Sequence, residues 1–192
     1  MNTLATLVVS LNLAYIGLLP RLFFRKDGRR GAMWWLTAAP FVVSGAGLVA
    51  SMWGFAAPAW ARDHDYALWQ DAAAVVLGGV SVLLISAARR AHPVPISLWH
   101  QQEDRPAGIV TRGPYRHVRH PFYAAFLLAL SAALVHSPHA MTLAALASAC
   151  VLLTATAVRE ERRLCASQFG PAYLAYMRSA GRFFPVWRRH DA

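Results

Sequence analysis

Charged residues are scarce in this chain. Only 15% of its 192 residues are Asp, Glu, Lys or Arg, whereas 57% are hydrophobic, and soluble domains carry about a quarter charged residues. The charges are also unevenly placed, because four runs contain none of them: residues 3–20, 31–61, 72–88 and 121–158. Uncharged runs of this length exclude an ordinary soluble domain and predict a helical membrane protein.

Cysteine is almost absent. Cys150 and Cys165 are too few and too far apart to supply the closely spaced ligand pairs of a zinc site. The segment 61–70 holds Asp63, His64 and Asp65, but no further ligands are spaced around them. We therefore interpret this segment as a solvated outer loop and expect no metal.

The uncharged runs predict an all-α bundle of five transmembrane helices in a single domain, residues 1–192. Residues 1–88 hold three of these helices, and residues 89–192 hold a polar loop, a helical hairpin and a tail. We expect the long run 121–158 to divide near Pro138, because proline removes a backbone donor and interrupts a helix. Its first part, 121–135, reaches only about 22 Å at 1.5 Å per residue. That helix is expected to cross the bilayer with difficulty or to lie partly within protein.

Basic residues set the expected topology. Eighteen of the 19 Lys and Arg residues fall on one side of the predicted helices, and Arg62 alone falls on the other. Because short cytoplasmic loops collect basic residues, we expect the N-terminus outside and the C-terminus in the cytoplasm. Abundant Ala, and Arg in place of Lys, indicate a GC-rich bacterial genome, so we expect the membrane to be a bacterial inner membrane. The net charge of +10 is then a topology signal that attracts anionic membrane lipids, and we expect no nucleic-acid partner.

Two polar stretches follow the third predicted helix. The segment 89–119 is about 30 residues long, and loops of that length are usually functional or disordered. Its Pro, Trp, His and Tyr content argues against disorder. The tail from Arg159 carries apolar residues at helical spacing around a break at 170–171. It predicts an amphipathic C-terminal helix that lies against the membrane or the polar loop.

Candidate chemistry lies in residues 108–123 and in two adjacent glutamates. Pro121 is expected to start a helix, where its missing donor costs nothing, so Arg119 and His120 stand at a helix entrance with unpaired amides. Glu160 and Glu161 lie at a membrane boundary, where charges are costly unless paired. A carboxylate there suits the ammonium of an amino-acid-like ligand, and an arginine suits its carboxylate. Surface salt bridges and simple helix capping are the alternatives.

Five short motifs occur in a fixed order in this half of the chain. They read Ile-Val-Thr-Arg-Gly-Pro-Tyr at 109–115, Arg-His-Pro-Phe-Tyr at 119–123, Glu-Glu-Arg-Arg-Leu at 160–164, Phe-Gly-Pro-Ala-Tyr at 169–173 and Phe-Pro at 184–185. In order and spacing, the series resembles the isoprenylcysteine carboxyl methyltransferase family of integral membrane enzymes. The first three predicted helices resemble the family only in hydropathy.

The resemblance implies a cytoplasmic site for S-adenosyl-L-methionine and methyl transfer to a lipophilic acceptor that enters from the bilayer. It implies catalytic roles for Arg119, His120 and Glu160, with Glu160 binding the methionyl ammonium. The implied cofactor-binding residues are His100, Gln101, Gly108, Ile109, Val110, Tyr115, His120, Pro121, Phe122, Tyr123, Glu160 and Glu161. The implied substrate residues are Thr156 and Arg159.

One position departs from the family pattern. Thr156 stands where the eukaryotic members have an arginine that contacts the substrate carboxyl, one helical turn before the cofactor glutamate. A small lipid-soluble phenol, thiol or related acceptor therefore fits this chain better than a prenylated cysteine carboxylate, and a general base is needed only for a phenol or amine. An NADPH-dependent membrane reductase of the sterol reductase type and a non-catalytic membrane scaffold remain alternatives. The oligomeric state stays open.

Overall fold

The computed structural model describes residues 2–23, 32–55, 67–92 and 108–186. These residues form six α-helices and one 3-10 turn, so the all-α prediction is confirmed. The elements in chain order are α1 (Thr3–Phe23), α2 (Ala32–Met52), α3 (Ala67–Ala91), η3 (Gly113–Arg116), α4 (Pro121–His136), α5 (Ala140–Cys165) and α6 (Gly170–Ser179).

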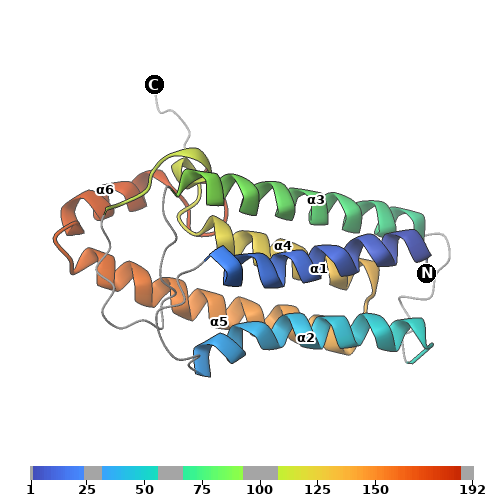
Figure 1. Ribbon diagram of the computed structural model, residues 1–192. Coiled ribbons are helices and arrows are strands. Elements are labelled where there is room, and N and C mark those ends of the chain that lie inside the picture. Colours follow the sequence, from blue (N-terminus) through green and yellow to red (C-terminus); the bar gives the residue numbers. More distant parts are fainter. Residues whose placement is uncertain (1, 24–31, 56–66, 93–107, 187–192) are drawn as a thin grey trace.

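The five long helices lie side by side in one bundle, and α6 and η3 gather at one end of it (Figure 1). Three helices carry segments long and apolar enough to cross a membrane: Trp35–Met52, Leu68–Ala91 and Ala140–Cys165. Two shorter apolar helices, Thr3–Leu18 and Pro121–His136, accompany them. The chain is thus an integral membrane protein, and the count of five crossings stays a prediction.

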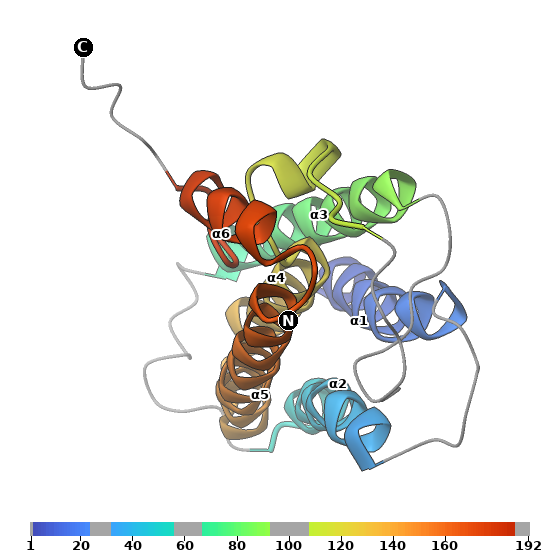
Figure 2. The ribbon, with the colours of Figure 1, turned by 90° about the vertical axis from the view of Figure 1, so that its left-hand side faces the viewer.

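Helix α4 lies among the other helices of the bundle (Figure 2). Eleven of its 16 residues are buried, and Ala125, Ala129 and Leu130 are fully enclosed. Small alanines allow neighbouring helices to approach closely, and α3 packs along α4 more extensively than any other pair of elements. At about 24 Å, α4 is short for a lipid-facing span, but its neighbours supply the apolar surroundings that it needs.

The predicted break near Pro138 is confirmed, because α4 ends at His136 and α5 begins at Ala140. His139 caps α5: its Nδ1 accepts from the Met141 N–H at 3.1 Å, while the Thr142 hydroxyl oxygen accepts from the His139 N–H at 3.1 Å. This reciprocal pairing satisfies amides that a helix start leaves without partners. The cap therefore fixes the turn between α4 and α5.

A buried polar contact joins three helices next to this turn. The His136 ring on α4 lies with Nδ1 2.7 Å from Asp71 Oδ1 on α3 and with Nε2 2.9 Å from Thr6 Oγ1 on α1. The His136 side chain is fully enclosed, and only 15% of the Asp71 side chain is exposed. Buried polar groups are costly unless paired, so this triad fixes the relative positions of α1, α3 and α4 at the end of the bundle opposite α6.

The predicted break at 170–171 is the start of α6. A Cβ on Gly170 would lie 2.3 Å from the carbonyl oxygen of Cys165, so only glycine allows the chain to turn this closely past the end of α5. Helix α6 buries Tyr173 and Tyr176 against a small apolar cluster that includes Ile109 and Leu164. The predicted amphipathic helix therefore forms, and its apolar side covers the segment that precedes η3.

Candidate active site

The tail after α6 pairs with the segment before α4. Val118 and Gly181 form a single parallel bridge. The N–H of Arg119 donates to the Gly181 carbonyl at 2.7 Å, the N–H of His120 donates to the Arg182 carbonyl at 3.0 Å, and the N–H of Gly181 donates to the His117 carbonyl at 3.0 Å. The expectation that the tail lies against the polar loop is confirmed. These bonds hold Arg119 and His120 in place before α4 begins.

Glu161 is the centre of a buried charge cluster. One of its oxygens lies 3.0 Å from Arg119 Nε and Nη2 and 3.2 Å from His120 Nε2, and the other lies 2.7 Å from Arg182 Nη2. Only 5% of the Glu161 side chain is exposed. A carboxylate has about four lone-pair sites, and these donors occupy them. Glu161 therefore joins α5, the pre-α4 loop and the tail.

Arg119, in the loop before α4, also binds the end of α6. Its Nη1 donates to the Met177 carbonyl at 3.2 Å and also to the carbonyl of Ala180. These two carbonyls lie at and beyond the end of α6, where helix carbonyls lack intrahelical partners. Arg119 thus ties the end of α6 to Glu161, and only 9% of its side chain is exposed.

Glu160 lies beside this cluster but is less fully engaged. The Tyr123 hydroxyl donates to its Oε1 at 2.8 Å, and His120 Nδ1 lies 3.5 Å from its Oε2. The Glu160 side chain is 28% exposed, compared with 5% for Glu161. Of the two neighbouring carboxylates, Glu160 is therefore the one with both acceptor capacity and access for a ligand.

Aromatic rings line this part of the site. The rings of His120 and Tyr123 stack at a centroid distance of 5.3 Å and an interplanar angle of 3°, and the edge of Phe183 meets His120 at 6.1 Å. Stacked and edge-to-face contacts of this kind restrict ring orientation. They hold the His120 nitrogens toward Glu160 and Glu161.

A layer of tyrosines supports the site from the α6 side. The Tyr176 hydroxyl donates to the backbone carbonyl of Tyr115, and the rings of Tyr173 and Tyr176 meet edge to face at 5.8 Å. Burial is the main cause that raises the pKa of Tyr176 to about 12 and raises the pKa of Tyr115 and Tyr173 above the ordinary value. All three phenols are neutral at physiological pH, so Tyr176 keeps its donor role.

His92 at the end of α3 is a neighbour that the sequence motifs did not single out. Its ring meets Tyr115 edge to face at 5.0 Å. Burial, and then the charge of Arg112, lower the pKa of His92 below its ordinary value, which favours an uncharged ring at neutral pH. Arg182 was also missed as a partner of Glu161. No sequence signal pointed to it, because Arg182 lies 21 residues beyond Glu161 and reaches it only through the folded tail.

The other predicted pocket residues have varied surroundings. Gly108 is exposed, Ile109 packs against the α6 tyrosines, and Val110 packs against the main core. Pro121 and Phe122 are buried in the first turn of α4. The structure thus brings together Arg119, His120, Tyr123, Glu160 and Glu161 in one contact network. His100 and Gln101 lie outside the described residues.

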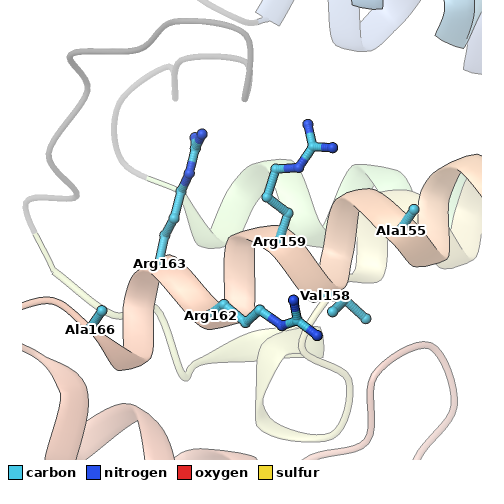
Figure 3. Close-up of a pocket in the computed structure, with 6 residues that line it drawn as sticks. All are labelled: Ala155, Val158, Arg159, Arg162, Arg163 and Ala166. Carbon is cyan, nitrogen blue, oxygen red and sulfur yellow. The ribbon is translucent and has the colours of Figure 1, made fainter.

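The two predicted substrate residues lie one turn apart on α5. Thr156 is buried, and its hydroxyl donates to the Leu152 carbonyl at 2.8 Å. Arg159 is exposed and lines an open hollow of about 540 Å³. Among the described residues, those that line it are shown in Figure 3: Ala155, Val158, Arg159, Arg162, Arg163 and Ala166.

Long apolar helices with a cluster of buried charges gathered at one end are typical of a helical integral membrane protein. Residues 75–167 match the model of the isoprenylcysteine carboxyl methyltransferase (ICMT) family. The match confirms the family resemblance seen in the motifs and supports a membrane methyltransferase of the isoprenylcysteine type. It contains most of α3, all of α4 and α5, and both glutamates. No curated protein matches the chain.

Proposed function

We propose that this protein is an S-adenosyl-L-methionine-dependent methyltransferase in which Glu160 binds the methionyl ammonium. The observation that carries the proposal is the unequal environment of the two glutamates. Glu161 is saturated by Arg119, His120 and Arg182, whereas Glu160 is partly exposed and has lone pairs to spare. An ammonium requires a carboxylate with free acceptor sites, so Glu160 fits the group.

The surrounding residues support this role. Tyr123 fixes one oxygen of Glu160 and leaves the other to face His120 at 3.5 Å. The stacked rings of His120 and Tyr123 offer aromatic surface, which attracts cations. We propose that Arg119 and Glu161 act as positioning residues, because their side chains bind each other and the tail. The backbone of residues 108–110 and Tyr115 would complete the pocket, together with His100 and Gln101.

The cofactor, when bound, supplies a methyl group on a sulfonium that a nucleophile can displace in line. The protein then needs mainly to orient the acceptor and exclude water. The α6 tyrosines and the paired tail cover the loop side of the site and would contribute to this exclusion. A carboxylate or thiolate acceptor needs no general base, whereas a phenol or amine does.

We propose a lipophilic acceptor that approaches Glu160 from the bilayer past Thr156. Thr156 lies one helical turn before Glu160 and therefore on the same side of α5. It is uncharged, and its hydroxyl is engaged by Leu152, so it offers no pairing for an acceptor carboxylate. Arg159 lies on the exposed side. A small phenol, thiol or related compound is the acceptor class that these surroundings favour.

We also propose that the Glu160 end of the bundle faces the cytoplasm of a bacterium. The described arginines of α3, α5 and α6 lie at this end: Arg89, Arg90, Arg159, Arg162, Arg163 and Arg178. Positive residues collect on the cytoplasmic side. The family match does not favour the NADPH reductase or the scaffold.

Calorimetric binding of S-adenosylhomocysteine to the detergent-solubilised protein tests the proposal, with NADPH titrated alongside. Glu160→Gln is expected to weaken binding about 10- to 100-fold, the loss expected when a charge-assisted hydrogen bond is removed. Asp71→Asn is the matched control, because it makes the same carboxylate-to-amide change at the opposite end of the bundle. Equal affinity in Glu160→Gln and the wild type would reject the role of Glu160, and binding of NADPH alone would reject the methyltransferase.

A further inference from the structure

The end of α5 presents carboxylates and guanidinium groups on different sides. Residues 155, 158, 159, 162, 163 and 166 form one stripe with helical spacing along the hollow. At about 100° per residue, Glu161 projects from the side away from this stripe, toward Arg119 and Arg182. The hollow is therefore a separate feature from the Glu161 cluster.

The stripe continues an exposed apolar surface along α5. Leu143, Ala147, Val151 and Ala155 follow each other at four-residue intervals and are exposed, with 55% of Leu143 and 72% of Val151 accessible. Arg159 and Arg163 occupy the next two positions of the same row. Because α5 is long and apolar enough to span a membrane, its exposed apolar row faces acyl chains. The arginines that end the row then lie at headgroup depth.

The arginines of the hollow offer an anion several donors. All three are exposed, and Arg159 and Arg162 make no ion pair or side-chain hydrogen bond with any residue in the described part of the chain. Arg163 acts electrostatically on Glu160 but makes no close pair with it there. In Figure 3, Arg159 and Arg163 extend away from α5 in the same general direction, and Arg162 runs along the helix toward Val158.

We propose that this hollow binds the phosphate of an anionic membrane lipid, with an acyl chain lying along the apolar row from Ala155 toward Leu143. Guanidinium groups bind phosphate oxygens in a bidentate manner. Three positive guanidinium groups favour a headgroup with a net negative charge over a zwitterionic one, because a zwitterionic headgroup also carries a positive charge. Ala155 and Val158 supply the apolar wall next to the charges. The row from residue 143 to residue 159 is about 24 Å long, whereas one leaflet supplies about half of the roughly 30 Å hydrocarbon region, so the acyl chain would cover the part of the row nearer to Ala155. The site does not depend on the methyltransferase proposal.

Native mass spectrometry of the detergent-solubilised full chain tests the site with soluble short-chain lipids. Dioctanoyl phosphatidylglycerol is the anionic lipid probe, and dioctanoyl phosphatidylcholine is the zwitterionic lipid probe. Inorganic phosphate is the third probe, because it has the phosphate group of a lipid but no acyl chains. We expect phosphatidylglycerol to bind at least fivefold more tightly than phosphatidylcholine, and phosphate to bind more weakly than both.

The triple variant Arg159→Gln, Arg162→Gln, Arg163→Gln should lose at least tenfold in affinity for phosphatidylglycerol. The matched control Arg89→Gln, Arg90→Gln, Arg116→Gln removes the same charge from exposed residues elsewhere and should remain within twofold of the wild type. An equal loss in both variants, or no loss in the first, would overturn the proposal.

Two further measurements separate this site from others. The double variant Arg159→Gln, Arg162→Gln keeps Arg163, which acts electrostatically on Glu160. Its affinity for S-adenosylhomocysteine should be unchanged, and a loss would assign the hollow to the cofactor site instead. Inorganic phosphate that binds as tightly as phosphatidylglycerol would identify a free anion, not a lipid, as the ligand. If the triple variant does not fold, Arg162→Gln alone should still lower the affinity for phosphatidylglycerol at least threefold, and an unchanged affinity would contradict the proposal.

Discussion

Glu161→Gln removes the charge on which two arginines and a histidine converge, and it nearly preserves the shape of the side chain. In the wild type, the Glu161 carboxylate accepts from Arg119, Arg182 and His120 within 3.2 Å. After the substitution, Arg119 has no anionic partner at this junction although only 9% of its side chain is exposed. The junction between α5, the loop and the tail should therefore weaken.

The size of the effect follows from burial. Removing one partner of a buried ion pair typically costs 3–5 kcal/mol, because the remaining charge is left uncompensated. Arg119 keeps the carbonyls of Met177 and Ala180, and Arg182 is 35% exposed, so both arginines retain some compensation. We expect a loss of about 3 kcal/mol in the free energy of unfolding, at the low end of the range.

Thermal unfolding of the purified protein in detergent measures this loss, and limited proteolysis reports whether the tail detaches first. Glu160→Gln is the control, because it makes the same change at the neighbouring residue. Its expected cost is about 1 kcal/mol, since it weakens a single hydrogen bond from Tyr123. Equal melting temperatures for Glu161→Gln and Glu160→Gln would refute the structural distinction between the two glutamates.

Three further substitutions test other parts of the fold by the same unfolding assay. Gly181→Ala should destabilise by about 1–3 kcal/mol, because the added Cβ would lie 1.8 Å from the Phe184 carbonyl oxygen and force the backbone to move; an unchanged melting temperature would contradict the pairing of the tail. His136→Leu should cost about 2–3 kcal/mol, because it removes the hydrogen-bond partner of the largely buried Asp71 carboxylate, and a neutral result would show that the contact contributes little. Tyr176→Phe should cost about 1 kcal/mol at pH 7. Because the pKa of Tyr176 is raised from 10.0 to about 12, the stabilisation by its neutral hydroxyl is fully present below pH 10 and is lost as the pH rises to 12. The free energy of unfolding of Tyr176→Phe should therefore fall less steeply between pH 10 and pH 12 than that of the wild type. An identical slope in the two proteins would refute this.

The sequence predicted the helices well because their signals are local. Uncharged runs marked α1 to α5, Pro138 marked the turn between α4 and α5, and the pair at 170–171 marked the start of α6. The central position of α4 in the bundle could not be predicted from the sequence. A helix that is apolar on all sides looks the same whether it faces lipid or protein, and only packing shows that α4 is enclosed.

The site was predictable as a set of motifs but not as a division of roles. Both glutamates were assigned to the cofactor, because adjacent residues share the same motif and the same helix end. Their different environments depend on Arg182, which lies 21 residues beyond Glu161 and reaches it only when the tail folds back. No local pattern encodes that contact, since the pairing of Val118 with Gly181 is set by the tertiary structure.

Side chains at the end of α5 face three different environments, because consecutive residues project about 100° apart around a helix. Glu161 faces the loop and tail, where two arginines neutralise it. Glu160 faces Tyr123 and His120 and remains partly exposed. Arg159 and Arg163 continue the exposed apolar row of α5. The Glu161 cluster holds the loop and the tail against α5. Glu160 therefore lies beside a fixed polar cluster while its second oxygen keeps acceptor capacity for a ligand.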